Sequence, residues 1–257
     1  MTRSVALFVA CRAALLAQEA PTAQSIIERA VAVHKASASV KYTWREEQEQ
    51  LHLDGKGGWK PAFTKTYDVI MLEGETYKKL VLQDGKPLDG KTQKKVDADL
   101  ARTRAARKAQ QRSTLLRKRM SVGDTEQLLK LFDNKLVGEE VVEGRATWKV
   151  ESEPKADFTP ETAAEKSAMS SRRTTWFDKQ AGAVVKRIDL TLRANNSFQP
   201  GTEVEMTYGP VRDQWLMVSL VARFDVKFAP MVRIRGEDRH RMLDYKRFEV
   251  DSSLKPE

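Results

Sequence analysis

Histidine is the side chain of this sequence with the clearest capacity for acid–base chemistry, and it occurs at His34, His52 and His240. These residues fall on different expected elements, and no two of them have the spacing of a metal-binding pair. His240 lies between Arg239 and Arg241, whose positive charges are expected to disfavour a protonated imidazole. The sequence has no G-x-S-x-G motif, phosphate-binding glycine loop or dinucleotide-binding fingerprint. We therefore expect a protein that is not an enzyme and uses no metal or cofactor.

Aromatic and apolar side chains on strand-like runs suggest a different chemistry, the binding of an apolar ligand. All five tryptophans fall in or beside such runs. Along a strand, every second side chain points to the same face. An ordinary filled core between sheet and helices would use the same pattern. If a cavity is present, this parity predicts that it is lined by Tyr42, Trp44, Phe63, Tyr67, Val69, Trp148, Trp176 and Met206.

The positive charge of the chain is concentrated in one segment. Twelve Lys or Arg and three Asp lie between Lys86 and Arg119, so this segment accounts for the whole formal net charge of +9. Residues 91–119 are rich in Ala, Arg, Lys and Gln and contain no Pro or Gly, which favours a long surface helix. The residues that we expect to dock this helix onto a partner are Arg102, Arg104, Arg107, Lys108 and Arg112.

Two interpretations of the basic helix stay open. It could attract an anionic membrane surface or an acidic envelope protein, or it could be a solvated charged helix with no partner. Nucleic acid is not expected as a partner, because no aromatic residue lies between Lys78 and Arg119 to stack on bases.

The elements that position these residues follow from the period of the apolar side chains. A spacing of three and four from Thr22 predicts a helix, and after Ser37 the period changes to two, which predicts a strand through Tyr42 and Trp44. Asp124 is the expected N-cap of a short amphipathic helix. The chain is predicted to be α+β with an antiparallel sheet. Its further strands are expected at about 63–72, 76–82, 136–142, 145–152, 172–178, 183–193, 202–208, 215–228 and 231–248.

The first residues indicate export. A short positive start, Met1-Thr2-Arg3, is followed by a largely apolar run to Ala17, which resembles a secretory signal peptide. This run is shorter than the roughly 20 apolar residues that cross a bilayer. An alternative is lipoprotein acylation at Cys11, the single cysteine. We expect a signal peptide over 1–17, a single domain over 18–257 and a location in the periplasm.

A series of short motifs runs through most of the chain. It comprises Asp84-Gly85-Lys86-Pro87-Leu88 before the charged helix, the run over 137–148 that ends in Ala146-Thr147-Trp148, Glu153-Pro154, Trp176-Phe177-Asp178 with Gly182, and 244–250. The series resembles bacterial outer-membrane lipoprotein-sorting-like proteins of the LolA/LolB half-barrel superfamily. The resemblance implies a strongly curved antiparallel sheet, or half-open β-barrel, covered by helices. A long basic helical insertion at about 88–133 departs from a minimal protein of this kind.

Two functions follow from these observations. The resemblance implies a periplasmic, non-enzymatic carrier or binding protein for lipoprotein acyl chains, lipid or another apolar ligand held inside the curved sheet. The alternative is a structural or regulatory envelope module with a filled core, which docks through the basic helix 91–119. The protein is expected to be a monomer.

Overall fold

The computed structural model describes residues 20–37, 40–54, 56, 58–113, 124–195, 198–229 and 232–248. The expected signal peptide over 1–17, with Cys11 inside it, lies outside these residues. So does the part of the predicted basic helix beyond residue 113. None of the helices within the described ranges combines the length and the apolar character that a membrane span needs.

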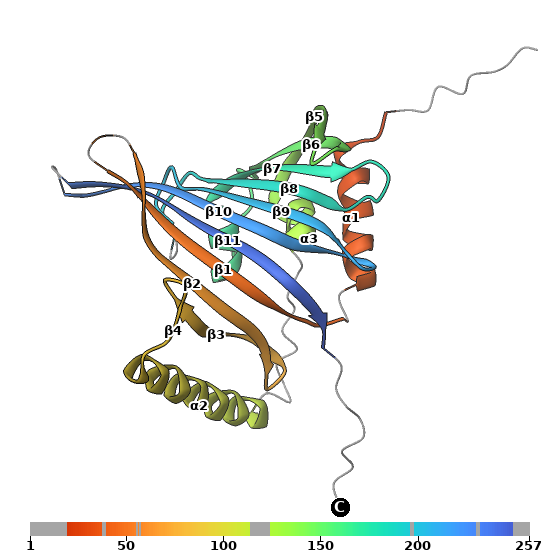
Figure 1. The fold of residues 1–257 in the computed structure, drawn as a ribbon. Helices are drawn as coiled ribbons and strands as arrows, with labels where there is room; N and C mark the ends of the chain where they lie inside the picture. The colour runs from red at the N-terminus through yellow and green to blue at the C-terminus, as the bar shows by residue number, and fades with distance from the viewer. Residues whose placement is uncertain are drawn as a thin grey trace, which may run out of the picture.

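One antiparallel sheet of eleven strands forms most of the molecule (Figure 1). Its strand order is β4-β3-β2-β1-β11-β10-β9-β8-β7-β6-β5, so the two edge strands β4 and β5 are not paired with each other and the sheet is not closed. The strands are β1 Tyr42–Leu53, β2 Trp59–Leu72, β3 Glu75–Gln83, β4 Lys86–Pro87, β5 Phe132–Val142, β6 Arg145–Pro154, β7 Ser171–Asp178, β8 Val184–Thr191, β9 Glu203–Val211, β10 Gln214–Ala229 and β11 Val232–Arg247.

The sheet consists of two meanders, as the sequence predicts. Strands β1 to β4 form the first and β5 to β11 the second, and β1 joins them by pairing with β11. Tight turns connect neighbouring strands: Asp84-Gly85 and Glu143-Gly144 both have positive φ at both residues. That backbone conformation is typical of type I′ hairpins, whose twist matches the twist of the paired strands.

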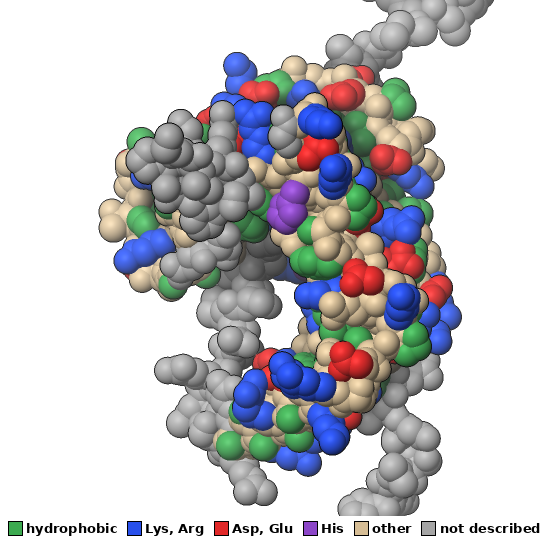
Figure 2. Space-filling view, turned by 60° about the vertical axis from the view of Figure 1, so that its left-hand side comes forward, with side chains coloured by type: hydrophobic (Ala, Val, Ile, Leu, Met, Phe, Trp, Pro, Cys, Tyr) green, Lys and Arg blue, Asp and Glu red, His purple; other side chains and the backbone are tan. Residues whose placement is uncertain are grey.

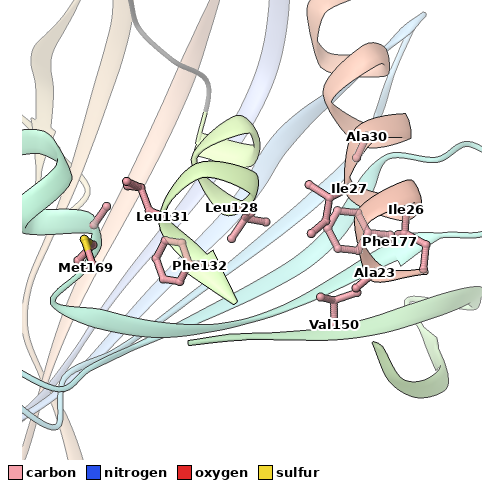
Figure 3. Close-up of a cluster of buried hydrophobic side chains, with 11 residues drawn as sticks. Ala23, Ile26, Ile27, Ala30, Leu128, Leu131, Phe132, Val150, Met169 and Phe177 are labelled. Atoms are coloured by element: carbon pink, nitrogen blue, oxygen red, sulfur yellow. The ribbon is translucent and has the colours of Figure 1, made fainter. Parts of the chain in front are cut away.

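Four helices are present in the described part of the chain: α1 Ala23–Ser37, α2 Gly90–Ser113, α3 Asp124–Leu131 and α4 Ala163–Ala168. Helices α1 and α3 pack together against the β5 to β7 end of the sheet (Figure 1). Their apolar faces bury the side chains that form the core (Figure 3). Its members are Ala23, Ile26, Ile27, Ala30, Leu128, Leu131, Phe132, Val150, Ala168, Met169 and Phe177.

Helix α2 lies along β3, near the opposite edge of the sheet (Figure 1). The hydroxyl of Tyr77 donates a hydrogen bond of 2.9 Å to Asp99 of this helix. The guanidinium of Arg107 donates hydrogen bonds of 2.9 to 3.0 Å to the carbonyl oxygens of Leu72, Glu75 and Thr76 around the β2–β3 turn. Polar contacts with a hairpin end therefore attach α2 to the sheet, and its few apolar residues add little.

The sheet has an inner face, which we define as the side that carries Val150 and Phe177 and that α1 and α3 cover. Directly opposed residues of paired strands point to the same side, so the strand register extends this face across the sheet. One continuous row on the inner face is Val150, Thr175, Arg187, Met206, Leu220, His240, Gln48 and Lys65. Figure 2 shows the molecule curving as a wall around a hollow.

The outer face carries ion pairs between neighbouring strands. Arg223 of β10 lies 3.1 Å from Glu205 of β9, and Arg45 of β1 lies 3.2 Å from Asp68 of β2. Partly exposed pairs of this kind contribute little to stability. They account for many of the acidic residues that alternate along the strands.

Candidate ligand-binding site on the inner face of the sheet

A cavity of about 420 Å³ opens on the inner face where α3 and α4 lie over strands β7 to β10. Val204, Met206 and Leu220 line one side of it, with Phe198 from the β8–β9 connection. Met206 and Leu220 are directly opposed on β9 and β10, so their side chains form one apolar surface. We call this space the α4 cavity.

The other side of the α4 cavity is charged. Arg173 of β7 and Arg187 and Asp189 of β8 line it. The Nε atom of Arg187 lies 3.1 Å from Oδ1 of Asp189, and that of Arg173 lies 3.7 Å from Oδ2 of the same carboxylate. The two arginine side chains also contact uncharged groups, since Arg173 lies over the ring of Phe132 and Arg187 donates to the sulfur of Met206. The cavity therefore combines an apolar wall with a cationic one.

A second cavity, of about 650 Å³, lies between the first turns of α1 and the β6 to β8 hairpins. Trp148 lines it, and the ammonium group of Lys179 sits 3.9 Å from the centre of the Trp148 ring. Arg29 of α1 donates hydrogen bonds to the carbonyl oxygens of Lys179 and Gln180 and so fixes the helix to the β7–β8 turn. The predicted ligand contact Trp148 is thus placed in a different cavity from Met206.

A polar cluster occupies the inner face further along the row, on β1, β2 and β11. Nδ1 of His240 lies 2.7 Å from Oε1 of Glu46, and Nε2 lies 3.2 Å from Oδ2 of Asp238. The amide of Gln48 donates to Asp238, and the hydroxyl of Tyr67 donates to Gln48. Both ring nitrogens of His240 are therefore engaged by carboxylates, which fixes the imidazole in place.

The protonation expected for His240 from its sequence neighbours is wrong. Burial by itself lowers the pKa of His240, but hydrogen bonds and charge from Asp238 and Glu46 raise it to about 9. Arg239 and Arg241 have little influence because alternation sends them to the outer face, where Arg241 pairs with Glu47. His240 is thus a structural cation at neutral pH.

The eight residues predicted to line one cavity are spread across the sheet. Met206 lines the α4 cavity and Trp148 the cavity beneath α1. On β1 and β2, Tyr42 and Trp44 pack against Tyr245, Val69 is buried, and Tyr67 belongs to the His240 cluster. Phe63 lies under the ammonium group of Lys65.

Trp176 is the predicted ligand contact that the structure places on the outer face. It is directly opposed to Lys149, and its Nε1 donates a hydrogen bond of 2.8 Å to Glu140. The neighbouring Phe177 points inward instead and is fully buried. Two adjacent aromatic residues give no alternation, so the sequence pattern could not choose between them.

The charged residues of the α4 cavity were missed by the sequence reasoning, although a signal was present. Arg187 and Asp189 follow Val185 at intervals of two, and Arg173 precedes Phe177 by four. Strand parity therefore places all three on the inner face. A charge at a position that parity predicts to be buried is unusual unless it is paired or bound.

The five predicted docking residues of α2 have different surroundings. The guanidinium of Arg107 is hydrogen-bonded to the β2–β3 turn, as described above. Arg104 and Lys108 lie 3.7 and 3.8 Å from Glu73. Arg102 pairs with Asp99 on the same helix. Arg112 lies in the last turn of α2, and its side chain is outside the described part of the structure.

Comparison with known proteins gives no match to a family model and none to a curated protein. Solved structures do match. They include a LolA superfamily protein. This protein, NE2245 from Nitrosomonas europaea, shares 8% identity over 93% of this chain and 99% of its own, with a TM-score of 0.38.

Two further structures match over similar lengths. A DUF1329 family protein from Desulfovibrio piger shares 12% identity over 91% of this chain and 95% of its own, with a TM-score of 0.39. A putative outer membrane lipoprotein-sorting protein domain from Vibrio parahaemolyticus shares 9% identity over 89% and 95%, with a TM-score of 0.37. Likeness of this degree concerns the arrangement of strands and helices alone.

Proposed function

We propose that this protein is a non-enzymatic binding protein that holds the apolar part of an amphiphile, such as a lipid or a lipoprotein acyl chain, on the inner face of its sheet. The α4 cavity carries this proposal. Its volume of about 420 Å³ lies within the range of roughly 300 to 1,000 Å³ that is usual for small-molecule sites. Val204, Met206 and Leu220 form a continuous apolar wall within it.

Apolar burial supplies the affinity in this proposal. Each methylene group that leaves water contributes about 0.8 kcal/mol, so a short length of acyl chain along β9 and β10 is enough for useful binding. The polar groups further along the inner face bond to one another, as His240 does with Glu46 and Asp238. This arrangement supports a binding role better than an acid–base one.

We infer further that the protein works in the periplasm. The N-terminal pattern over 1–17 supports export, and the remaining chain, 18–257, would then be the mature single domain. A carrier of amphiphiles is useful where these molecules must cross an aqueous compartment between two membranes.

Replacing Leu220 by tryptophan is expected to weaken the binding of an uncharged apolar fluorophore, N-phenyl-1-naphthylamine, by about tenfold or more. The larger side chain would occupy the α4 cavity beside Met206, which is directly opposed to Leu220, and tenfold corresponds to about 1.4 kcal/mol. Fluorescence titration measures the effect. The matched control is Leu243→Trp, because Leu243 is partly exposed on β11 and faces away from the cavity.

The circular dichroism spectra of Leu220→Trp and Leu243→Trp should be the same, which shows that both variants are folded. Unchanged binding by Leu220→Trp would show that the α4 cavity is not the site. A wild-type protein that binds no apolar probe would overturn the proposed function itself.

A second function, docking through α2, is supported by the exposed side of that helix. Exposed basic side chains gather there, and Figure 2 shows them around the hollow's lower rim. They include Lys91, Lys94, Lys95, Arg102, Arg104 and Lys108. This basic surface, with the remainder of the expected segment 88–133, would bind an anionic membrane or an acidic envelope protein.

Docking of this kind is expected to depend steeply on salt. The Debye length falls from about 10 Å at 0.1 M to about 3 Å at 1 M, so electrostatic attraction to vesicles rich in phosphatidylglycerol should be lost over that interval. Vesicle sedimentation measures it. The double variant Lys94→Glu with Lys95→Glu should not sediment with these vesicles at low salt, whereas salt-independent sedimentation of the wild type would contradict electrostatic docking.

A further inference from the structure

The cavity beneath α1, which we call the α1 cavity, has an apolar floor. Its volume of about 650 Å³ is within the usual range for small-molecule sites. Ile26 and Phe177, which line it, belong to the buried core and lie next to each other beneath α1 (Figure 3). Trp148 is directly opposed to Phe177 on β6 and β7, so its side chain points to the same face. These three side chains therefore form one continuous apolar surface.

The polar side chains that line the α1 cavity are each bonded to another group of the protein. They are Ser25, Arg29, Asp178 and Lys179. Ser25 donates a hydrogen bond to the carbonyl oxygen of Thr22, and Arg29 donates to two carbonyl oxygens of the β7–β8 turn. Asp178 accepts hydrogen bonds from Arg145 and from two main-chain N–H groups of the same turn. Lys179 pairs with Glu139 and lies over the Trp148 ring.

The chemistry of the lining indicates the class of ligand. Because the polar groups already have partners, a ligand in the α1 cavity gains little from new hydrogen bonds. It gains from the transfer of its own apolar surface out of water and onto Ile26, Trp148 and Phe177. An uncharged alkyl chain fits this lining.

The α1 cavity and the α4 cavity lie at opposite ends of β7. Phe177 lines the first cavity near the β7–β8 turn, and Ser171 lines the second at the start of the strand. At about 3.3 Å per residue, these two positions are about 20 Å apart. The core residues Leu128 and Phe132 lie between them (Figure 3). A ligand in one cavity therefore does not reach the other through the core.

We propose that the α1 cavity is a second binding site, separate from the α4 cavity, which holds an uncharged alkyl chain against Ile26, Trp148 and Phe177. The protein then carries two alkyl chains at once, one at each end of β7. This inference extends the proposed function by a second site, and either site can fail without the other.

Tryptophan fluorescence distinguishes the two sites, because Trp148 lines the α1 cavity and no tryptophan is among the described residues that line the α4 cavity. The probe is 10-bromo-1-decanol, whose bromine quenches tryptophan on contact. We expect native mass spectrometry to show two bound probes on the wild-type protein, whose fluorescence is partly quenched. Trp148→Phe should keep both probes and lose the quenching. The matched control Trp215→Phe, which removes a tryptophan that lies beneath Arg145, should keep the quenching.

A variant that fills the α1 cavity tests the site independently. Ser25 is exposed on the first turn of α1 and lines the cavity, so Ser25→Phe occupies this space without entering the core. It should raise the probe concentration for half-maximal quenching by about tenfold or more and leave one bound probe. The matched control Glu28→Phe, at an exposed position of the same helix, should change neither.

The possible outcomes separate the second site from the proposed function. A single bound probe that causes no quenching and is lost in Leu220→Trp overturns the second site and leaves the proposed function intact. A single bound probe that quenches Trp148 and survives Leu220→Trp supports the α1 site and overturns the α4 cavity as the site of the proposed function. Quenching that persists in Trp148→Phe overturns the second site, and binding of no probe overturns both.

Discussion

Replacing Phe177 by alanine is expected to lower the free energy of unfolding by about 3–5 kcal/mol, the usual loss when a buried phenylalanine is truncated. Phe177 is fully buried between α1 and the sheet, close to Ile26, Ile27 and Val150 (Figure 3). Truncation leaves a void that the main chain of β7, paired on both sides, cannot close. Domains of ordinary stability have a free energy of unfolding of about 5–15 kcal/mol. The expected loss is therefore a large part of the stability of this protein. Urea denaturation followed by tryptophan fluorescence measures it.

The matched control is Val141→Ala, which removes apolar atoms from a side chain that is 72% exposed on β5. Its effect should stay within about 0.5 kcal/mol. If Phe177→Ala unfolds at the same urea concentration as the wild type, the cluster beneath α1 and α3 is not the core of this fold.

The strands with regular alternation and sharp turns could be predicted from the sequence. The last predicted strand, 231–248, corresponds closely to β11 at Val232–Arg247. The first strand was predicted through Tyr42 and Trp44 but without an end, because from Arg45 to Gln50 every residue of β1 is polar. Glu46 and Gln48 sit on the inner face there, where His240 and Asp238 take the place of apolar packing. A strand stabilised by such polar pairs has no hydrophobic period to recognise.

The candidate site was harder to predict than the fold. The alternation of side chains along a strand shows which face of the sheet a residue is on, but not how far it lies from residues on other strands. Trp148 and Met206 do share the inner face, but β7 and β8 lie between β6 and β9, so three inter-strand steps of about 4.8 Å each separate the two residues. The pairing of β1 with β11, which brings Glu46 to His240, joins residues at opposite ends of the chain. Local patterns carry no information on contacts of this range.

Raising the pH from about 6.5 to about 9 is expected to destabilise the protein through His240. The pKa of its imidazole is raised from 6.5 to about 9 in the folded protein. The folded protein therefore binds the imidazole proton more tightly than the unfolded chain does. That stabilisation is fully present below pH 6.5 and is lost as the pH rises through 9. With about 1.4 kcal/mol for each pKa unit, the loss amounts to roughly 3 kcal/mol.

The carboxylates of the same cluster set the acid side of this profile. Burial raises the pKa of Glu46, but hydrogen bonds to His240 and Lys78 lower it further than burial raises it. The pKa of Asp238 is lowered in the same way by His240 and Gln48. The stability that these two carboxylates contribute is present at pH values above the usual carboxylate pKa. It is lost as the pH falls through their lowered pKa values. The cluster therefore stabilises the fold most between about pH 5 and pH 6.5.

Urea unfolding at a series of pH values tests this profile, with His240→Gln as the variant. The variant should be less stable than the wild type at pH 6 and should lose the decline between pH 6.5 and 9, because it has no proton to release. His34→Gln is the matched control, since His34 lies on the exposed side of α1 and its loss should leave the decline in place. A decline that persists in His240→Gln would show that the carboxylates on β1 and β11 do not hold a protonated imidazole between them.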